Sequence, residues 1–334
     1  MGADGHPYSY HINYCHGSKY PKPPGKRSFR IQDTAWPWSK YQVSFEAMLL
    51  RLLRLIPLGI LSYLTGRIVA LRLPRPLALI ANRTFCRLYG VRTEEAASSI
   101  DEYRSLAELF TRDLKAGSRP QHEGVTSPVD GTLRDLGEIN NGQIPQVKGW
   151  TYTLSALLQD QALAERFRNG SYLNFYLSPP DYHHVHLPLD AALTEMRYIP
   201  GTFWPVNDWA LRTVPQLFCS NERVVMLFDT EAGMVALIMV GALNVSKISL
   251  TFDPFVSHDS PGHGEVVHHT YQAPLALKKG DRLGTFHLGS TVVILFERPG
   301  FASLRPTIAS AAKVQVGQAI LRTGPGGPVL AEMR

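Results

Sequence analysis

Residues 283–297, LGTFHLGSTVVILFE, place two strand-like segments on either side of a Gly-Ser pair. Val, Ile and other apolar residues dominate both segments, a composition that favours β-strands. Gly289 and Ser290 interrupt the pattern. A glycine in such a place usually marks a turn, a bulge or the close approach of another group to the backbone. A turn is the plainer interpretation, and the rest of the chain has to decide.

Strand-like patterns continue on both sides of this stretch. Glycines separate short apolar segments from Val125 onward, and residues 234–252, MVALIMVGALNVSKISLTF, contain two longer ones. Earlier in the chain the patterns are helical, and residues 93–114 are predicted to form one or two short helices with acidic starts. We therefore predict an α+β protein, with N-terminal amphipathic helices beside a β-rich core of mainly antiparallel strands. Its parts are an irregular basic tail (1–40), a helical region (41–120) and the β-rich core (121–334).

Basic residues concentrate near the N-terminus. Residues 1–92 hold 14 Lys and Arg and three acids, a net charge of +11, so the rest of the chain carries −5 of the total of +6. From Ser44 to Ile80 arginines alternate with Leu, Ile and Val, which is typical of helices on an anionic membrane surface. The longest uncharged run, Leu55–Gly66, has 12 residues, whereas a spanning helix needs about 20. We predict membrane contact, with a structural cover for the core as the alternative.

The cysteines and most histidines do not form a metal motif. Cys15, Cys86 and Cys219 are too few and too scattered for a disulfide framework or a zinc site, and they indicate a reducing compartment. The histidine-rich stretch at residues 257–271 has no recognisable ligand spacing. We predict a polar loop there and no bound metal. Nucleic-acid binding is not expected either, because stacking aromatics do not accompany the arginines.

Three short stretches place reactive side chains in apolar surroundings. They are SPVDG (127–131), YLSPPDYHHVHLP (176–188) and the Gly289-Ser290 pair. Taken singly, an Asx turn, packed core histidines and a turn are the plainer interpretations. Taken together, Asp130, His186 and Ser290 supply the orienting carboxylate, base and nucleophile that activate a hydroxyl group.

Eight segments occur in an order and spacing that resemble one known family. They are LAELFTRDLKAGSRP (106–120), SPVDG (127–131), VKGWTYTLSALL (147–158), YLSPPDYHHVHLP (176–188), IPGTFWPVN (199–207), NERVV (221–225), VGALNV (240–245) and LGST (288–291). In this combination they resemble the phosphatidylserine decarboxylase proenzymes. The resemblance extends from about residue 45 to residue 317.

The resemblance implies that the chain cuts itself between Gly289 and Ser290. Ser290 Oγ would attack the Gly289 carbonyl, and elimination would leave a pyruvoyl group, a covalent cofactor, at the new N-terminus. Asp130, His186 and Ser290 match the triad of the family, with His186 as the base. His183 matches the histidine that protonates the product carbon or holds the substrate carboxylate. The products would be a β chain (1–289) and an α chain (290–334) that stay together as a heterodimer.

The implied enzyme converts phosphatidylserine in an anionic membrane to phosphatidylethanolamine and CO2, through a Schiff base between the substrate amine and the pyruvoyl group. Residues 41–120 would then associate with the membrane, and residues 121–334 would form the catalytic core. The expected location is peripheral, on the cytoplasmic face of a bacterial inner membrane, with the mitochondrial inner membrane as the alternative. A homodimer is compatible with the sequence. His184, a position that is often Arg in relatives, is expected to face solvent.

Two other functions stay open on the residues alone. SPVDG and the KKGDRLG turn (278–284) also occur in biotinyl-like and phosphocarrier β-domains, in which a histidine accepts phosphate. The same three side chains would also serve a serine hydrolase, although the Gly-x-Ser-x-Gly elbow is missing. Both alternatives predict an uncut chain, and the carrier reading leaves the Gly289-Ser290 interruption unexplained.

Reversing the charge at Arg51, Arg54 and Arg67 should weaken binding to anionic vesicles, because each arginine near the surface contributes about 1 kcal/mol. Added salt should have the same effect, since it screens these charges. Co-sedimentation with phosphatidylserine-containing vesicles across a salt series measures both. Binding that neither treatment changes would mean that the helices are only a structural cover.

Overall fold

The computed structural model describes residues 58–146, 150–243, 247–257, 265–287, 289–298, 301 and 304–323, which all belong to one compact unit, Phe45–Arg334. The predicted basic tail, Arg51 and Arg54 lie outside the described residues. The helices are α2 (Leu58–Val69), α3 (Arg75–Tyr89), α4 (Leu106–Phe110), α5 (Leu154–Leu158), α6 (Gln161–Arg166), α7 (Asp208–Thr213) and α8 (Leu217–Ser220). The strands are β1 (Val125–Thr126), β2 (Gly131–Glu138), β3 (Gln143–Pro145), β4 (Thr151–Thr153), β5 (Ser171–Leu177), β6 (His184–His186), β7 (Ala191–Ile199), β8 (Arg223–Thr230), β9 (Gly233–Gly241), β10 (Ile248–Leu250), β11 (Val267–Leu277), β12 (Arg282–Phe286), β13 (Ser290–Phe296), β14 (Leu304–Pro306), β15 (Ala312–Val314) and β16 (Ala319–Thr323).

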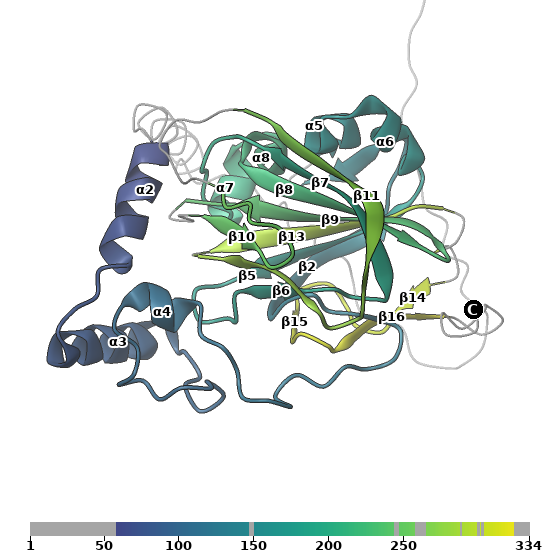
Figure 1. Cartoon of the computed structure of the whole chain (residues 1–334). Coiled ribbons are helices and arrows are strands. Elements are labelled where there is room, and N and C mark those ends of the chain that lie inside the picture. The colour runs from purple at the N-terminus through teal and green to yellow at the C-terminus, as the bar shows by residue number, and fades with distance from the viewer. Residues whose placement is uncertain are drawn as a thin grey trace, which may run out of the picture. The chain divides into compact units, whose positions relative to one another are not determined.

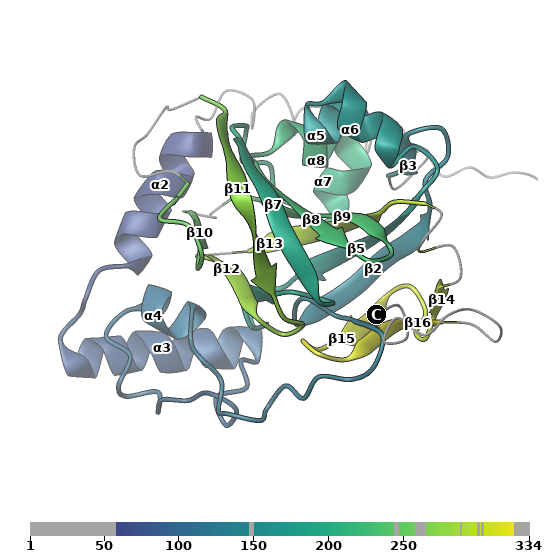
Figure 2. The same cartoon turned by 45° about the vertical axis from the view of Figure 1, so that its right-hand side comes forward.

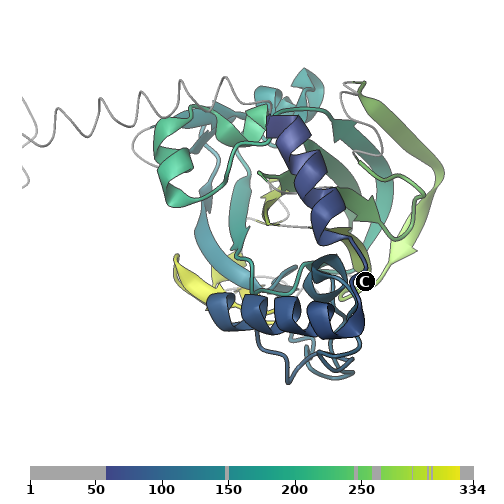
Figure 3. The same ribbon diagram turned by 90° about the vertical axis from the view of Figure 1, so that its left-hand side faces the viewer.

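The predicted α+β architecture is confirmed. The main sheet has eight strands in the order β11-β7-β8-β9-β13-β5-β2-β15 (Figure 1). Two three-stranded sheets, β10-β12-β6 and β1-β16-β14, and the pair β3-β4 accompany it. Every pairing between these named strands is antiparallel. The α2 and α3 helices precede all of the strands and lie together at one end of the sheets (Figure 3).

Local signals explain where the N-terminal helices begin and end. Pro74 precedes α3, and Gly90 ends it in the left-handed conformation at φ 70°. Of the predicted helices at residues 93–114, only α4 forms, with the Ser105 side chain accepting a hydrogen bond from the Glu108 amide at its start. The residues before it are not α-helical, because the Ser99 hydroxyl bonds instead to nearby carboxylates in a local turn.

The β13 strand occupies the middle of the main sheet and is buried along its whole length. It pairs with β9 on one side and β5 on the other from Ser290 through Phe296. At its first residue, Ser290 lies between Leu177 and Gly241. Directly opposed residues of an antiparallel sheet point to the same face, so this register fixes which face receives the Ser290 side chain.

The face that receives Ser290 is covered by the β10-β12-β6 sheet (Figure 2). Met239 is two residues before Gly241 on β9 and therefore shares the face of Ser290. A Cβ added at Gly284 of β12 would lie 3.2 Å from Met239 Sδ, so the two strands are in close contact. The sequence at residues 278–286 predicts a tight hairpin turn. The turn forms at residues 278–281, but the hairpin is wrong, because the strands that it joins, β11 and β12, pair in different sheets.

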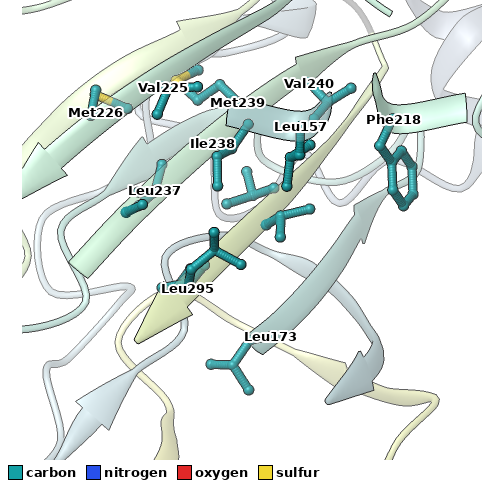
Figure 4. Packing of buried hydrophobic residues seen from close by; sticks show 14 of the residues in the cluster. Leu157, Leu173, Phe218, Val225, Met226, Leu237, Ile238, Met239, Val240 and Leu295 are labelled. Atoms are coloured by element: carbon teal, nitrogen blue, oxygen red, sulfur yellow. The ribbon is translucent and has the colours of Figure 1, made fainter. Parts of the chain in front are cut away.

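The opposite face of the main sheet packs against α5 and α8. Leu157 and Phe218 of these helices lie beside the apolar residues of β8 and β9 in the continuous hydrophobic core (Figure 4). On this face a guanidinium group is completely buried, that of Arg223. It donates hydrogen bonds to the carbonyl oxygens of Ala156, Leu157, Cys219 and Asn221, over 2.6–2.9 Å. Arg223 thus ties the ends of both helices to the sheet.

Replacing Arg223 by Met should lower the free energy of unfolding by about 3–5 kcal/mol, because four buried carbonyl groups lose their shared donor. Arg212→Met is the matched control, since Arg212 is exposed on α7, and it should change stability by less than about 0.5 kcal/mol. Urea unfolding followed by circular dichroism measures both. Equal stability of the two variants would contradict this role for Arg223.

Candidate functional site

The Ser290 side chain is fully buried, and its hydroxyl has no hydrogen-bond partner among the described residues. A buried hydroxyl without a partner costs roughly 1–3 kcal/mol, which makes it a candidate for a reacting group. The preceding residue, Gly289, is partly exposed, and a Cβ added there would meet no atom within 4 Å. The backbone on the N-terminal side of Ser290 is therefore less crowded than the strand that follows it.

His186 lies on β6, in the sheet that covers the face of Ser290. Its Nδ1 is 2.7 Å from the Gly280 carbonyl oxygen and its Nε2 is 3.2 Å from the Tyr182 hydroxyl. Because a carbonyl can only accept, Nδ1 carries the proton, and the unprotonated Nε2 accepts from the Tyr182 hydroxyl. Burial lowers the pKa of His186. The ring is thus neutral near pH 7, with a basic nitrogen at Nε2.

Asp130 lies in the turn at residues 127–131, and the backbone of this turn is hydrogen-bonded to that of His186. The His186 amide donates to the Pro128 carbonyl over 2.8 Å. The Asp130 carboxylate, however, accepts hydrogen bonds from the Arg119 guanidinium and from the Val316 amide. Among the described residues no hydrogen bond joins Asp130 to His186, or His186 to Ser290. The fold brings the three elements together without linking the three side chains directly.

Asp130 also lines a cavity of about 520 Å³ between the N-terminal region and the core. Its wall holds four basic and three acidic side chains, namely Arg92, Arg112, Arg119, Lys313, Glu95, Asp130 and Asp181. Ion pairs with these carboxylates engage three of the four basic groups, all but that of Arg112.

His183 is fully buried just before β6, with its ring 3.9 Å from that of Phe110. Its Nδ1 lies 2.9 Å from the Asp181 carbonyl oxygen, so Nδ1 is protonated, and Nε2 has no partner among the described residues. Burial, with a smaller effect of Arg112, lowers the pKa of His183 to about 3. The carbonyl of His183 accepts from the Phe286 amide, four residues before Ser290. In this state His183 can accept a proton but has none to give at Nε2.

The expectation that His184 faces solvent is wrong. Its side chain is buried, with Nδ1 2.7 Å from Thr285 Oγ1 and Nε2 3.1 Å from the Thr111 carbonyl oxygen. Burial lowers its pKa to about 4. By the alternation of β6, His184 shares a side with His186 and lies opposite His183, and both sides of this short strand are covered. His184 joins α4 and its following loop to β12.

A buried carboxyl group that was not predicted from the sequence lies on the same face of the main sheet as Ser290. Glu222 is fully buried and accepts hydrogen bonds from the Tyr198 hydroxyl at 2.8 Å and the Ser257 hydroxyl at 3.0 Å. Burial raises its pKa to about 7. The only sequence signal was an acidic residue directly before the apolar strand at residues 223–228, inside the NERVV segment.

No three His, Cys, Asp or Glu side chains lie close enough to hold a metal ion within the part of the chain that the structure describes. The polar loop predicted for residues 257–271 is wrong for residues 267–271, which belong to β11, the strand that pairs with β7. His269 Nδ1 lies 2.9 Å from the Asp253 carboxylate, and residues 258–264 are outside the described ranges.

Comparisons with known proteins place the chain in a family. Residues 106–322 match the family model described as phosphatidylserine decarboxylase. The chain is 41% identical over 276 residues to a phosphatidylserine decarboxylase proenzyme of Anaeromyxobacter sp. (strain K), covering 82% of this chain and 97% of that protein. It is 39% identical to the proenzyme of the same description from Myxococcus xanthus (strain DK1622), covering 81% and 96%. It is 40% identical to the one from Alcanivorax borkumensis, covering 78% and 91%.

Mild acid should destabilise the uncut protein, because buried histidines stay neutral in the folded state. Burial lowers the pKa of His183 and His287 to about 3 and that of His184 to about 4, whereas the unfolded chain takes up these protons below about pH 6.5. Their stabilisation is therefore complete above pH 6.5 and is lost as the pH falls. Glu222 acts in the opposite direction. Because its pKa is raised, the folded state binds this proton at a higher pH than the unfolded chain does, which stabilises the fold as the pH falls.

The net loss between pH 6.5 and 5.5 should be about 2 kcal/mol. Each of the three histidines contributes about 1 kcal/mol, because the unfolded ring is only half protonated at about pH 6.5, and Glu222 offsets about 1 kcal/mol. Urea unfolding of the Ser290→Ala protein at the two pH values measures it. Equal or greater stability at pH 5.5 would contradict the neutral state of these rings.

Proposed function

The chain belongs to the phosphatidylserine decarboxylase family, and from this membership we propose that it converts phosphatidylserine to phosphatidylethanolamine and CO2. We further propose that it first cuts itself between Gly289 and Ser290. The word proenzyme in the names of its relatives supports such processing. The observation that carries the proposal is the buried, unpartnered hydroxyl of Ser290 at the first position of the central strand.

Self-cleavage would begin with attack of Ser290 Oγ on the Gly289 carbonyl carbon. The C–N bond breaks as an ester forms, and the amino group of residue 290 becomes free. Loss of the α-proton of residue 290 then breaks the ester, which releases the Gly289 carboxylate and leaves a dehydroalanine. Water adds to that group and ammonia leaves, so that a pyruvoyl group remains. The open space around Gly289 suits the bending that the first step needs.

We assign the role of base to His186, with Asp130 as its supporting carboxylate. Donation of Nδ1–H to Gly280 keeps His186 Nε2 unprotonated, so Nε2 can take a proton in place of the hydrogen bond that it accepts from the Tyr182 hydroxyl. Asp130 is held by Arg119, so its contribution to His186 is electrostatic in this arrangement and raises the pKa of the ring against the effect of burial. A closer approach would follow if His186 became protonated during the attack.

The residues present fit a pyruvoyl group at position 290, because the buried hydroxyl there has no hydrogen-bond partner within the described part of the chain. When formed, this group supplies a carbonyl that condenses with the substrate amine and accepts the electrons left by CO2. His183 is our candidate for handling the proton at the substrate carbon. Its free Nε2 must first take up a proton before it can return one.

The β chain (1–289) and the α chain (290–334) would remain together after cleavage. The α chain contributes β13 to the centre of the main sheet, β15 to its edge and β16 to a second sheet. Its residues of β13 are almost entirely inaccessible to solvent. Separation would expose this apolar strand and break two complete ladders of backbone hydrogen bonds.

We also propose that α2 and α3 hold the protein at an anionic membrane. Both helices expose large apolar side chains, namely Ile60, Leu61, Leu64, Ile68, Leu77, Ile80, Leu88 and Tyr89. Arginines at positions 67, 75, 83 and 87 are exposed on the same two helices. No helix within the described ranges has the length and apolar character to span a bilayer. This surface supports a peripheral location, for which we favour the cytoplasmic face of a bacterial inner membrane over the mitochondrial inner membrane.

Intact-mass spectrometry under denaturing conditions tests the self-cleavage. The purified protein should give two chains, one that ends at Gly289 and one that begins with a pyruvoyl group at position 290. Ser290→Ala should remain a single chain. Thr291→Val is the control, because Thr291 also has a buried, unpartnered hydroxyl but points to the opposite face, and it should still be cut.

One uncut chain in all three proteins would remove the cofactor and the mechanism, and would favour the carrier or hydrolase alternatives. Cleavage in Ser290→Ala would equally contradict the assignment of the nucleophile.

A further inference from the structure

Glu222 lies in one row with Ser290 across the main sheet. Gly241 of β9 pairs with Ser290 of β13 on one side. On its other side, the backbone N–H of Gly241 donates to the Glu222 carbonyl oxygen. Since Arg223 is opposite Val240, the register continues to Glu222 and Gly241. The side chains of Glu222 and Ser290 therefore point to the same face, two strands apart, with only a glycine between them.

The fold does not demand this glycine. A Cβ added at Gly241 would lie 3.4 Å from Glu222 Oε1, an ordinary contact, and Gly241 is not among the residues with positive φ. By comparison, a Cβ at Gly170 or Gly131 would lie within 2.4 Å of a carbonyl oxygen of a neighbouring strand. A glycine inside a strand is unfavourable by roughly 0.5–1 kcal/mol relative to alanine. Because Gly241 has no side chain, the strand between them places no side chain between the Glu222 carboxyl group and residue 290.

Glu222 also lacks a positive partner. Its two carboxylate oxygens accept from the Tyr198 and Ser257 hydroxyls, and no Lys, Arg or His of the described residues pairs with it. Leaving a buried carboxylate without a counter-charge is expensive. The cation that the proposed reaction must bring to residue 290 is the ammonium group of the substrate.

We propose that Glu222 receives the ammonium group of phosphatidylserine beside residue 290 and removes one of its protons, so that the neutral amine can attack the carbonyl there. This inference rests on the proposed function. An ammonium group has no free electron pair and cannot attack before it loses a proton. Burial brings the pKa of Glu222 to about 7, which suits a group that both takes and returns a proton near neutral pH.

The proton balance closes without another reactant. One proton passes from the ammonium to the Glu222 carboxylate, and the nitrogen electron pair forms the new C–N bond. A second N–H proton moves to the former carbonyl oxygen, which becomes a hydroxyl. Glu222 then returns its proton to that hydroxyl, which leaves as water while the C=N bond forms. Glu222 is again a carboxylate at the end.

Two probes of different charge test this role in the purified, self-cleaved protein. The first is phosphatidylethanolamine with six-carbon acyl chains, which carries the ammonium but has no carboxylate to lose, with cyanoborohydride to reduce the adduct. The second is hydroxylamine, which is uncharged near neutral pH. The mass of the α chain reports both adducts. In Glu222→Gln the hydroxylamine adduct should form at the unmodified protein's rate, and the lipid adduct about 10²-fold more slowly.

Asp253→Asn is the matched control. Asp253 is also buried and accepts from a tyrosine hydroxyl, that of Tyr271 at 2.8 Å, but it is paired with His269 instead of lying in the row of Ser290. Both adducts should form at the unmodified protein's rate. Gly241→Ala is a second test variant, because its methyl group would separate Glu222 from residue 290, and it should slow only the lipid adduct.

Equal slowing of both probes in Glu222→Gln, or of neither, would overturn the inference. If the Glu222→Gln protein does not cut itself, the rates of the two adducts in Gly241→Ala decide instead. If both precursors stay uncut, the inference is also wrong, because the row then serves the cleavage. A normal protein that forms no hydroxylamine adduct would contradict the proposed function itself, and the inference with it.

Discussion

The double antiparallel pairing of β13 is the constraint on which the rest of the structure depends. This strand pairs residue for residue with β5 and β9 from Ser290 to Phe296. Because a shift of one residue would turn every side chain to the other face, the register determines that Ser290 points toward β12 and β6. It also determines that Thr291 points toward the helices. A chain cut directly before Ser290 would leave a terminus anchored in the centre of the sheet.

Burial controls the chemistry of the surrounding histidines. His183 and His186 each donate Nδ1–H to a backbone carbonyl, which leaves a basic Nε2 in both rings. Burial favours the neutral ring in each case and lowers its pKa. The same effect acts in the opposite direction on Glu222, whose pKa rises. The site thus holds neutral bases and a carboxyl group close to its point of titration, the combination that proton transfer near neutral pH requires.

The site could be predicted in part. The SPVDG, HHVH and GST segments identified Asp130, His186 and Ser290 as candidates, and their elements are neighbours in the fold. The hydrogen-bond partners could not be predicted. Arg119, which holds Asp130, and Gly280, which orients His186, are 11 and 94 residues away along the chain. Their contacts depend on how separate strands and loops pack, and local sequence patterns carry no information about such packing.

The sequence by itself determined the α+β class, the strand character of residues 290–296, the amphipathic basic helices and the reactive residue types, because periodicity and composition are local properties. Only the tertiary structure decided that His184 is buried, that β11 and β12 belong to different sheets, and that Glu222 shares a row with Ser290. The physical reason is that burial and sheet register arise from contacts between segments far apart in the chain. Gly241 shows the difference most clearly. In the sequence it is one more glycine in an apolar strand, whereas in the sheet it is the position without a side chain between Glu222 and Ser290.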